Sequence, residues 1–144
     1  VDQKIIESFG GIKVNNLNDG LKEADILSLS VPLTETTRNM INSEKIKMMK
    51  KSAVIINTSR GGVVNEKDIS EALDKKIIYG AGLDVFEKEP PDYGNPLLKN
   101  KRIILTPHAA TFTKECLSNM SIETVQNVID FFENKLNKSM IVKL

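Results

Sequence analysis

The chain has 144 residues, of which 40% are hydrophobic and 27% charged, and its basic and acidic side chains almost balance at a formal net charge of +1. This balance gives no indication of a nucleic-acid partner or of an anionic membrane surface, and no apolar run approaches the ~20 residues of a membrane-spanning helix. The only cysteine, Cys116, excludes an internal disulfide. With no signal peptide at its start, the sequence predicts a cytoplasmic protein with one hydrophobic core.

The predicted elements alternate between short apolar runs and amphipathic stretches. An initial helix, Asp2 to Phe9, is followed by a short strand, Ile12 to Val14. Four longer runs rich in Ile, Val and Leu then fit strands buried on both faces, as in a parallel sheet. These four predicted strands are residues 24–31, 52–58, 77–86 and 102–106.

The amphipathic stretches between these runs predict helices. From Ser43 to Lys50 apolar side chains recur at a three-residue step, and Asn65 is placed to cap a helix that ends at Asp74. The longest predicted helix runs from about Thr113 to Leu136. The alternation of strand and helix predicts an α/β fold, a partial, Rossmann-like, doubly wound parallel sheet with a long C-terminal helix.

The glycine pairs of this sequence do not predict a phosphate-binding loop. Such a loop needs the pattern G-x-G-x-x-G between a strand and the first turn of a helix, where backbone amides face the phosphate. Gly80 and Gly82 are followed by further strand residues, and Gly10-Gly11 by the predicted short strand. We expect Gly80 and Gly82 to permit close packing instead.

Polar residues follow each of the four longer strands. The segment 31–34 lies at the end of the first strand, Thr58–Gly62 at the end of the second and His108 just past the fourth, while Asp84 lies near the end of the third. Carboxyl ends of parallel strands meet at one edge, where ligands bind in open α/β sheets, so we expect an arginine, an aspartate and a histidine to converge there. The two glycines behind Arg60 would let a ligand approach the backbone.

Each candidate also has an ordinary structural interpretation. Arg60 is compatible with a surface ion pair, and the Thr-Ser pair before it is typical of turns. Asp84 is compatible with a turn or capping residue, and Glu89 lies in a polar loop where exposed carboxylates are common. His108, the only histidine, is compatible with a loop or a satisfied core position.

Five stretches occur in a specific order: "ADILSLSVPLTETTRNMI", "MKKSAVIINTSRGGVVNEKDISEAL", "GAGLDVFEKEP", "NPLL" and "ILTPHAA". Together they resemble the D-isomer-specific 2-hydroxyacid dehydrogenases, a family that includes phosphoglycerate dehydrogenase and glyoxylate/hydroxypyruvate reductase. The resemblance spans about residues 20–115, most of the chain. It implies an oxidoreductase that interconverts a D-2-hydroxy acid and a 2-oxo acid, with NAD as the family's default cofactor and NADP as the alternative.

The resemblance gives three residues catalytic roles. Arg60 matches the family arginine that holds the substrate carboxylate and helps to polarise its 2-oxo group. His108 matches the acid/base residue, and Glu89 matches the carboxylate paired with it. Formate dehydrogenases of this superfamily carry glutamine at the position of Glu89, because hydride transfer from formate needs no proton relay. The carboxylate here therefore favours a 2-hydroxy acid.

The resemblance also implies which residues line the cofactor groove. Asp84 matches the residue that hydrogen-bonds the nicotinamide carboxamide. The complete set of implied cofactor contacts is Val31, Pro32, Thr37, Thr58, Ser59, Arg60, Asp84, His108 and Ala109. The chemistry agrees with these roles, since a histidine held by a carboxylate can give a proton to a developing alkoxide near neutral pH and take one in the reverse direction.

The sequence departs from the family pattern in what it lacks. The G-x-G-x-x-G turn, the acidic residue that selects NAD over NADP and the substrate domain are all expected upstream of Val1. Residues 1–112 are therefore interpreted as a truncated NAD-binding domain, and residues 113–144 as a helix and tail that return toward an absent substrate domain. We expect a fragment that does not turn over by itself, and the sequence does not indicate which 2-hydroxy acid the parent enzyme uses.

The expected partners are a small 2-hydroxy or 2-oxo acid and a second copy of the chain, with no nucleic acid and no membrane. Two alternatives stay open. Corepressors of the C-terminal-binding type resemble the same dehydrogenases, keep the arginine, glutamate and histidine, and act mainly as cofactor-sensing dimers. The chain is also compatible with a nonfunctional remnant that folds and self-associates through an exposed sheet edge.

Overall fold

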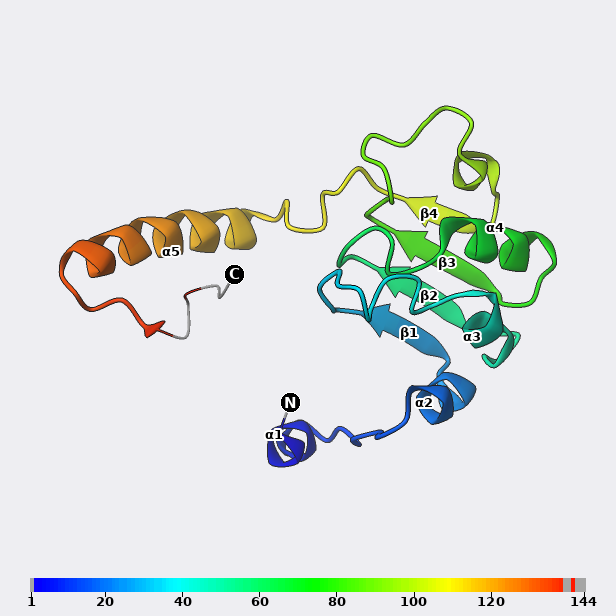
Figure 1. The fold of residues 1–144 in the computed structure, drawn as a ribbon, viewed down its shortest axis with the longest axis horizontal. Helices are drawn as coiled ribbons and strands as arrows, with labels where there is room; N and C mark the ends of the chain where they lie inside the picture. The colour runs from blue at the N-terminus through cyan, green and yellow to red at the C-terminus, as the bar shows by residue number, and fades with distance from the viewer. Residues whose placement is uncertain (1, 139–140, 142–144) are drawn as a thin grey trace. The chain divides into compact units, whose positions relative to one another are not determined.

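The computed structural model describes residues 2–138 and 141, and the chain divides into two compact units, Val1–His108 and Ala109–Leu144. The first unit contains four parallel strands in the spatial order β1-β2-β3-β4 (Figure 1). Their bounds are β1 Ile26–Leu29, β2 Val54–Asn57, β3 Gly80–Leu83 and β4 Ile103–Leu105. Each lies within one of the four longer predicted strands, so the predicted α/β fold is confirmed. The predicted boundary after residue 112 stays a prediction.

Helical segments accompany the sheet. In the described residues they are α1 Gln3–Ser8, α2 Leu17–Glu23, α3 Ser43–Lys47, α4 Glu66–Asp74, the 3₁₀ helix η1 Pro96–Lys99 and α5 Lys114–Phe132. The sequence prediction does not include α2 and η1. The predicted strand Ile12–Val14 is wrong: these residues have no regular structure, and Ile12 is 88% exposed because no described strand lies beside it to complete a ladder.

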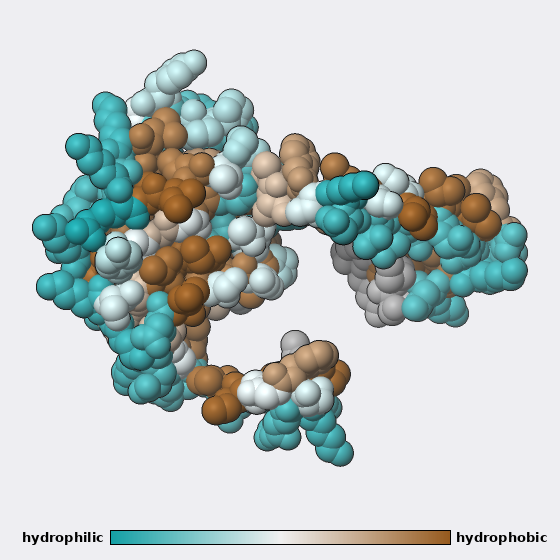
Figure 2. Space-filling view, turned by 180° about the vertical axis from the view of Figure 1, so that it is seen from behind, coloured by the Kyte–Doolittle hydropathy of each residue, from teal (hydrophilic) through white to brown (hydrophobic). Residues whose placement is uncertain are grey.

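The sheet has one covered and one bare face within the first unit. Residues that pair in register share a face, and α3 and α4 pack over the face that carries Ile55 and Leu83, both buried. The opposite face carries Ile26 and Ile104, which are 69% and 74% exposed. Figure 2, seen from behind, shows hydrophobic residues gathered over the sheet. The helices of the first unit therefore cover one side of its sheet only.

Helix α4 shows why these residues fold as they do. Asn65 caps it, as predicted, because the Asn65 Oδ1 accepts a hydrogen bond from the N–H of Asp68 at 2.9 Å. Ile69 and Leu73, one turn apart, are fully buried, and burial of each such side chain contributes roughly 1.5–3 kcal/mol. The Asp68 carboxylate also accepts from the N–H of Ser43 at 2.8 Å, which ties α4 to α3.

Helix α5 belongs to the second unit. Thr113 caps it by accepting a hydrogen bond from the N–H of Cys116 at 3.1 Å, and none of its residues is buried. Within the described part of the chain, no helix is both long enough and apolar enough to cross a membrane. The tail that is predicted to return toward a substrate domain falls mostly on residues 139, 140 and 142–144, which lie outside the described residues.

Candidate active site

The carboxyl ends of β2, β3 and β4 meet at one edge of the sheet. Asn57 pairs in register with Leu83, and Leu83 with Leu105, so the last residues of these three strands lie side by side. The segments that follow them carry Arg60, Asp84 and His108. The structure therefore brings these three segments to a common edge, as the sequence predicts.

A buried asparagine shapes the turn after β2. Asn57 is 2% exposed, its amide donates to the carbonyl of Arg60 at 3.0 Å, and its Oδ1 accepts from the N–H and the hydroxyl of Ser59 at 3.0 and 2.7 Å. These bonds fix the direction in which the Arg60 side chain leaves the backbone. Asn57 is not among the residues predicted from the sequence, although a lone amide at the end of an apolar strand is a signal for such a role.

Arg60 is exposed and has no carboxylate partner in the described residues, so the surface ion-pair interpretation does not apply. Its Nη1 donates to the carbonyl of Ser59 at 2.7 Å, which orients the guanidinium and leaves its other N–H groups for a ligand. Thr58 is exposed and Ser59 half-buried at the same turn.

Gly61 and Gly82 permit close packing of neighbouring segments. A Cβ on Gly61 would lie 1.7 Å from the carbonyl oxygen of Phe86, so only glycine lets the turn pack against the segment after β3. The expectation that the two glycines behind Arg60 admit a ligand stays a prediction. In β3, a Cβ on Gly82 would lie 3.1 Å from the Cδ1 of Ile56, which confirms the predicted close packing.

Asp84 joins the ends of three strands. It is 3% exposed, its N–H donates to the carbonyl of Asn57 at 3.0 Å, and its carbonyl accepts from the N–H of His108 at 2.8 Å. Its carboxylate accepts the hydroxyl of Thr106. Asp84 thus extends the backbone pairing of the strand ends and places a buried carboxylate at the candidate site. Thr106, which the sequence analysis did not single out, holds that carboxylate in place.

His108 and Glu89 form a direct pair. His108 Nδ1 lies 2.7 Å from Glu89 Oε2, and Glu89 Oε1 accepts from the N–H of Phe86 at 2.9 Å. The histidine has a left-handed backbone, with φ of 53°, and its side chain is 48% exposed, so it is not a core histidine. The pair borders a cavity of about 240 Å³ lined by Phe86, Glu89, Pro90, Pro91, Pro107 and His108.

The bonds to Glu89 change its acidity. The hydrogen bond from His108 and, second, that from the Phe86 N–H hold the pKa of the Glu89 carboxyl below its ordinary value of 4.5. Partial burial and the nearby Asp84 carboxylate oppose this effect. Glu89 is therefore ionised at neutral pH and able to fix the orientation and tautomer of the imidazole.

The other predicted cofactor contacts lie in two places. Val31 is half-buried and Pro32 exposed in the segment after β1, where the Thr37 hydroxyl donates to the carbonyl of Pro32 at 2.7 Å and closes the turn. Ala109 is half-buried and is the first residue of the second unit. Among the described residues, no three His, Cys, Asp or Glu side chains are arranged to hold a metal ion.

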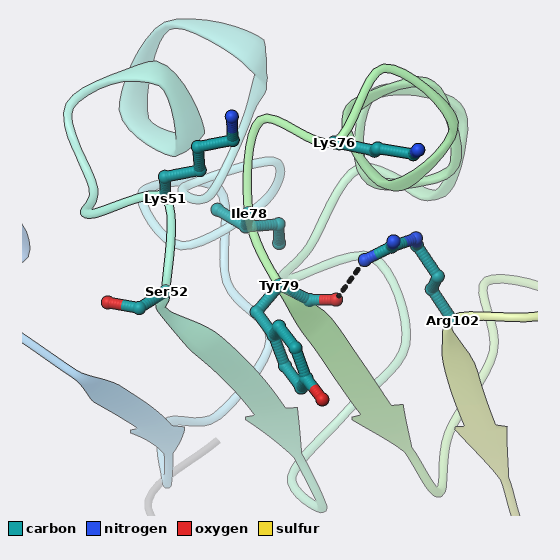
Figure 3. Close-up of a pocket in the computed structure, with 6 residues that line it drawn as sticks. All are labelled: Lys51, Ser52, Lys76, Ile78, Tyr79 and Arg102. Atoms are coloured by element: carbon teal, nitrogen blue, oxygen red, sulfur yellow. Dashed lines mark hydrogen bonds between the residues drawn. The ribbon is translucent and has the colours of Figure 1, made fainter.

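A second cavity lies at the opposite edge of the sheet. It measures about 430 Å³ and is lined by Lys51, Ser52, Lys76, Ile78, Tyr79 and Arg102 (Figure 3). Arg102 Nη1 donates to the carbonyl of Tyr79 at 3.1 Å. The cavity has no acid/base pair and lies at the amino ends of the strands, away from the edge where open α/β sheets bind ligands. It includes none of the predicted site residues.

The chain is similar to one protein family and to curated relatives that are named as reductases or dehydrogenases. Residues 2–110 match the family described as "D-isomer specific 2-hydroxyacid dehydrogenase, NAD binding domain". A glyoxylate reductase of Korarchaeum cryptofilum is 42% identical over 131 residues, which are 91% of this chain and 40% of the relative. A D-3-phosphoglycerate dehydrogenase of Methanocaldococcus jannaschii is 45% identical over 115 residues, 80% of this chain and 22% of the relative.

Two solved structures agree. A D-isomer specific 2-hydroxyacid dehydrogenase from Lactobacillus delbrueckii ssp. bulgaricus, in its NAD-complexed form, has a TM-score of 0.81 at 31% identity. A D-lactate dehydrogenase from Aquifex aeolicus, complexed with NAD and lactic acid, has a TM-score of 0.80 at 33% identity. Each match covers 94% of this chain and 45% of the solved chain. The chain thus spans less than half the length of all four proteins.

Proposed function

The chain belongs to the D-isomer-specific 2-hydroxyacid dehydrogenase family through the NAD-binding domain of that family, and from this membership we propose that it serves the NAD-dependent interconversion of a D-2-hydroxy acid and a 2-oxo acid. The observation that carries the proposal is the 2.7 Å pair between His108 and Glu89 at the carboxyl edge of the sheet. A histidine held by a carboxylate, beside a buried aspartate and an arginine with no carboxylate partner among the described residues, suits carbonyl reduction better than a purely structural task.

His108 handles the proton. Glu89 binds Nδ1, and among the described residues Nε2 makes no hydrogen bond, so Nε2 is the nitrogen that can face a substrate oxygen. In the reductive direction the imidazolium donates the Nε2 proton to the oxygen of the 2-oxo group as it becomes an alkoxide. In the oxidative direction the neutral ring accepts the hydroxyl proton, and Glu89 keeps the ring in the required tautomer.

Arg60 holds the substrate carboxylate. A guanidinium offers parallel N–H donors that match a carboxylate in a bidentate pair, and it stays charged at any physiological pH. The bonds of Asn57 to the turn and of Nη1 to Ser59 restrict its orientation before substrate arrives. We propose that the oriented Arg60 guanidinium aligns the substrate so that its 2-oxo oxygen faces His108.

The residues present fit the nicotinamide end of the cofactor. Asp84 offers a buried carboxylate, oriented by Thr106, as an acceptor for the carboxamide amine. The turn closed by Thr37 and Pro32 offers backbone groups at the same edge. NAD, when bound, accepts the hydride from the 2-hydroxy acid, and NADH returns it. We propose NAD rather than NADP because the two solved relatives are NAD complexes.

The proposed substrate is a small 2-oxo acid of the glyoxylate or hydroxypyruvate type. Glyoxylate reductases and a D-3-phosphoglycerate dehydrogenase are among the matched relatives. Glu89 argues against formate, because hydride transfer from formate needs no proton donor.

The proposal also includes self-association in the cytoplasm. Ile26 and Ile104 leave apolar surface on the bare sheet face, and a second copy would remove it from water. Sedimentation should detect a dimer whose fraction rises with protein concentration. A stable monomer over the whole concentration range would contradict this part of the proposal.

A chimera tests the function directly. The chain replaces the matched 131-residue stretch of the Korarchaeum cryptofilum glyoxylate reductase, and NADH oxidation is followed with glyoxylate, hydroxypyruvate, pyruvate and 3-phosphohydroxypyruvate. We expect turnover with at least one acid and its loss in a His108→Asn chimera that folds equally well. A folded chimera with no turnover above that control would overturn the proposal.

A further inference from the structure

One carboxyl group ties together both ends of the loop that carries Glu89. Glu66, the first residue of α4, accepts the N–H of Glu87 with Oε1 at 2.6 Å and the side-chain amide of Asn95 with Oε2 at 2.7 Å. Glu87 lies in the first part of the loop between β3 and η1, and Asn95 ends it. Glu89 lies between them, two residues after the first tie.

The two ties from Glu66 to Glu87 and Asn95, together called the clamp, are anchored to the core. Glu66 stands at the start of a helix that buries Ile69 and Leu73, so its backbone is held by packing. The contact with Glu87 is reciprocal, because the Glu66 N–H donates to Glu87 Oε1 at 3.3 Å. At the other end, the Asn95 Oδ1 accepts the N–H of Leu97 at 3.0 Å. This bond orients the side-chain amide so that its Nδ2 points to Glu66.

From these contacts we infer that Glu66 is a positioning residue for the acid/base pair, although it touches neither member. It holds Glu87, whose neighbour Phe86 donates its N–H to Glu89, and Glu89 in turn holds His108. Releasing either end of the loop loosens both hydrogen bonds that lower the pKa of Glu89. The inference rests on the proposed function only in giving that pair a catalytic task.

A swap of hydrogen-bonding groups tests the clamp. Glu66→Gln places an amide N–H₂ against either the Glu87 N–H or the Asn95 amide, so one tie is lost. Asn95→Asp places two carboxylates against each other. In the double variant the Glu66→Gln amide donates to the Asn95→Asp carboxylate, and its carbonyl still accepts the Glu87 N–H. Asn95→Asp also keeps an oxygen for the N–H of Leu97.

The readout is the pKa of Glu89, measured in the 144-residue chain by NMR with ¹³C-carboxyl-labelled glutamate. The Glu89 resonance is assigned by its disappearance in Glu89→Gln. We expect the Glu89 pKa to rise toward 4.5 in each single variant and to fall again in the double variant. The matched control is Glu71→Gln on the same helix, which breaks only an exposed pair with Lys75 and should leave the Glu89 pKa unchanged.

Two results would overturn the inference. One is an unchanged Glu89 pKa in Glu66→Gln, and the other is a double variant whose pKa stays as high as that of the single variants. An additional readout is the chimera, in which Glu66→Gln should lower kcat more than it alters the KM for NADH. The NMR titration needs neither cofactor nor turnover. It can therefore contradict the positioning role of Glu66 while the proposed activity stands, and it can support that role even if the chimera shows no activity.

Discussion

The two edges of the sheet hold their charged side chains in different ways. At the carboxyl edge, Asp84 and Glu89 accept hydrogen bonds from other segments, and His108 is held at both its ring and its backbone. At the amino edge, Lys51 and Lys76 have no ion-pair partner among the described residues. Yet the amino edge has the larger cavity, about 430 Å³ against about 240 Å³.

Cavity size and charge alone therefore do not distinguish the candidate site from the amino edge. Catalysis depends on groups whose orientation is fixed before the substrate arrives, because ordering them during the reaction costs free energy. The His108–Glu89 pair at the carboxyl edge meets this condition. At the amino edge Arg102 is held by the Tyr79 carbonyl, but the cavity there has no acid/base pair. Substitutions that lower turnover should therefore lie at the carboxyl edge, whereas substitutions at the amino edge should change stability or nothing.

The largest expected effect is that of His108→Gln in the chimera. Removing the acid/base group should lower kcat by about 10²–10⁴-fold, the usual contribution of such catalysis. Lys76→Gln, at the amino edge, should leave kcat within about two-fold, since surface changes away from the site have small effects. Steady-state NADH oxidation measures both. Similar losses in the two variants would remove the distinction between the edges.

Arg60→Lys should have the next largest effect. A lysine cannot make the bidentate pair, and loss of one charge-assisted hydrogen bond, worth ~1.5–3 kcal/mol, lowers kcat/KM for the 2-oxo acid by about 10- to 150-fold. The matched substitution at the other edge is Arg102→Lys, which should leave kcat/KM unchanged. If both variants bind and reduce the acid as well as the parent chimera, Arg60 does not hold the carboxylate.

Asn57→Ala removes side-chain hydrogen bonds at the carboxyl edge without removing a charge. It leaves the Arg60 carbonyl and the Ser59 N–H without their buried partner, so the free energy of unfolding should fall by ~1–3 kcal/mol. Urea unfolding of the 144-residue chain measures it, with the exposed Ser52→Ala as the control, expected within ~0.5 kcal/mol of the parent. An equal effect of the two substitutions would show that the turn is not held by Asn57.

The smallest expected effect is at the amino edge. Lys76 has a left-handed backbone with φ of 56°, which costs a non-glycine residue roughly 1–2 kcal/mol. Lys76→Gly relieves that strain but adds unfolded-state entropy, so a net gain of up to ~1 kcal/mol is expected. Lys75→Gly, where φ is −79°, should instead destabilise the chain. Thermal unfolding separates the two, and destabilisation by both would contradict the account.

The sequence predicted what depends on local pattern. The four strands, the Asn65 cap and the common edge of Arg60, Asp84 and His108 all follow from apolar runs and from strand parallelism. The short strand at Ile12–Val14 failed because a strand needs a neighbour, and β-propensity does not reveal whether one is present.

The sequence could not predict the tertiary contacts that hold the segments of the candidate site in place. The ties that Glu66 makes to Glu87 and Asn95 join residues 21 and 29 positions apart. The contact of Gly61 with the Phe86 carbonyl likewise depends on how two loops cross. Such contacts arise from tertiary packing, and no local signal in a single sequence encodes them.

The most direct test of the central claim, that His108 and Glu89 act as a pair, is a titration of the Glu89 carboxyl with and without His108. We expect a pKa below 4.5 in the parent chain and a rise toward 4.5 in His108→Asn. Since a lowered pKa stabilises the fold above the unfolded value, that stabilisation should be present at neutral pH and be lost as the pH falls through the folded pKa. A Glu89 carboxyl that titrates at its ordinary value in both proteins would contradict the account.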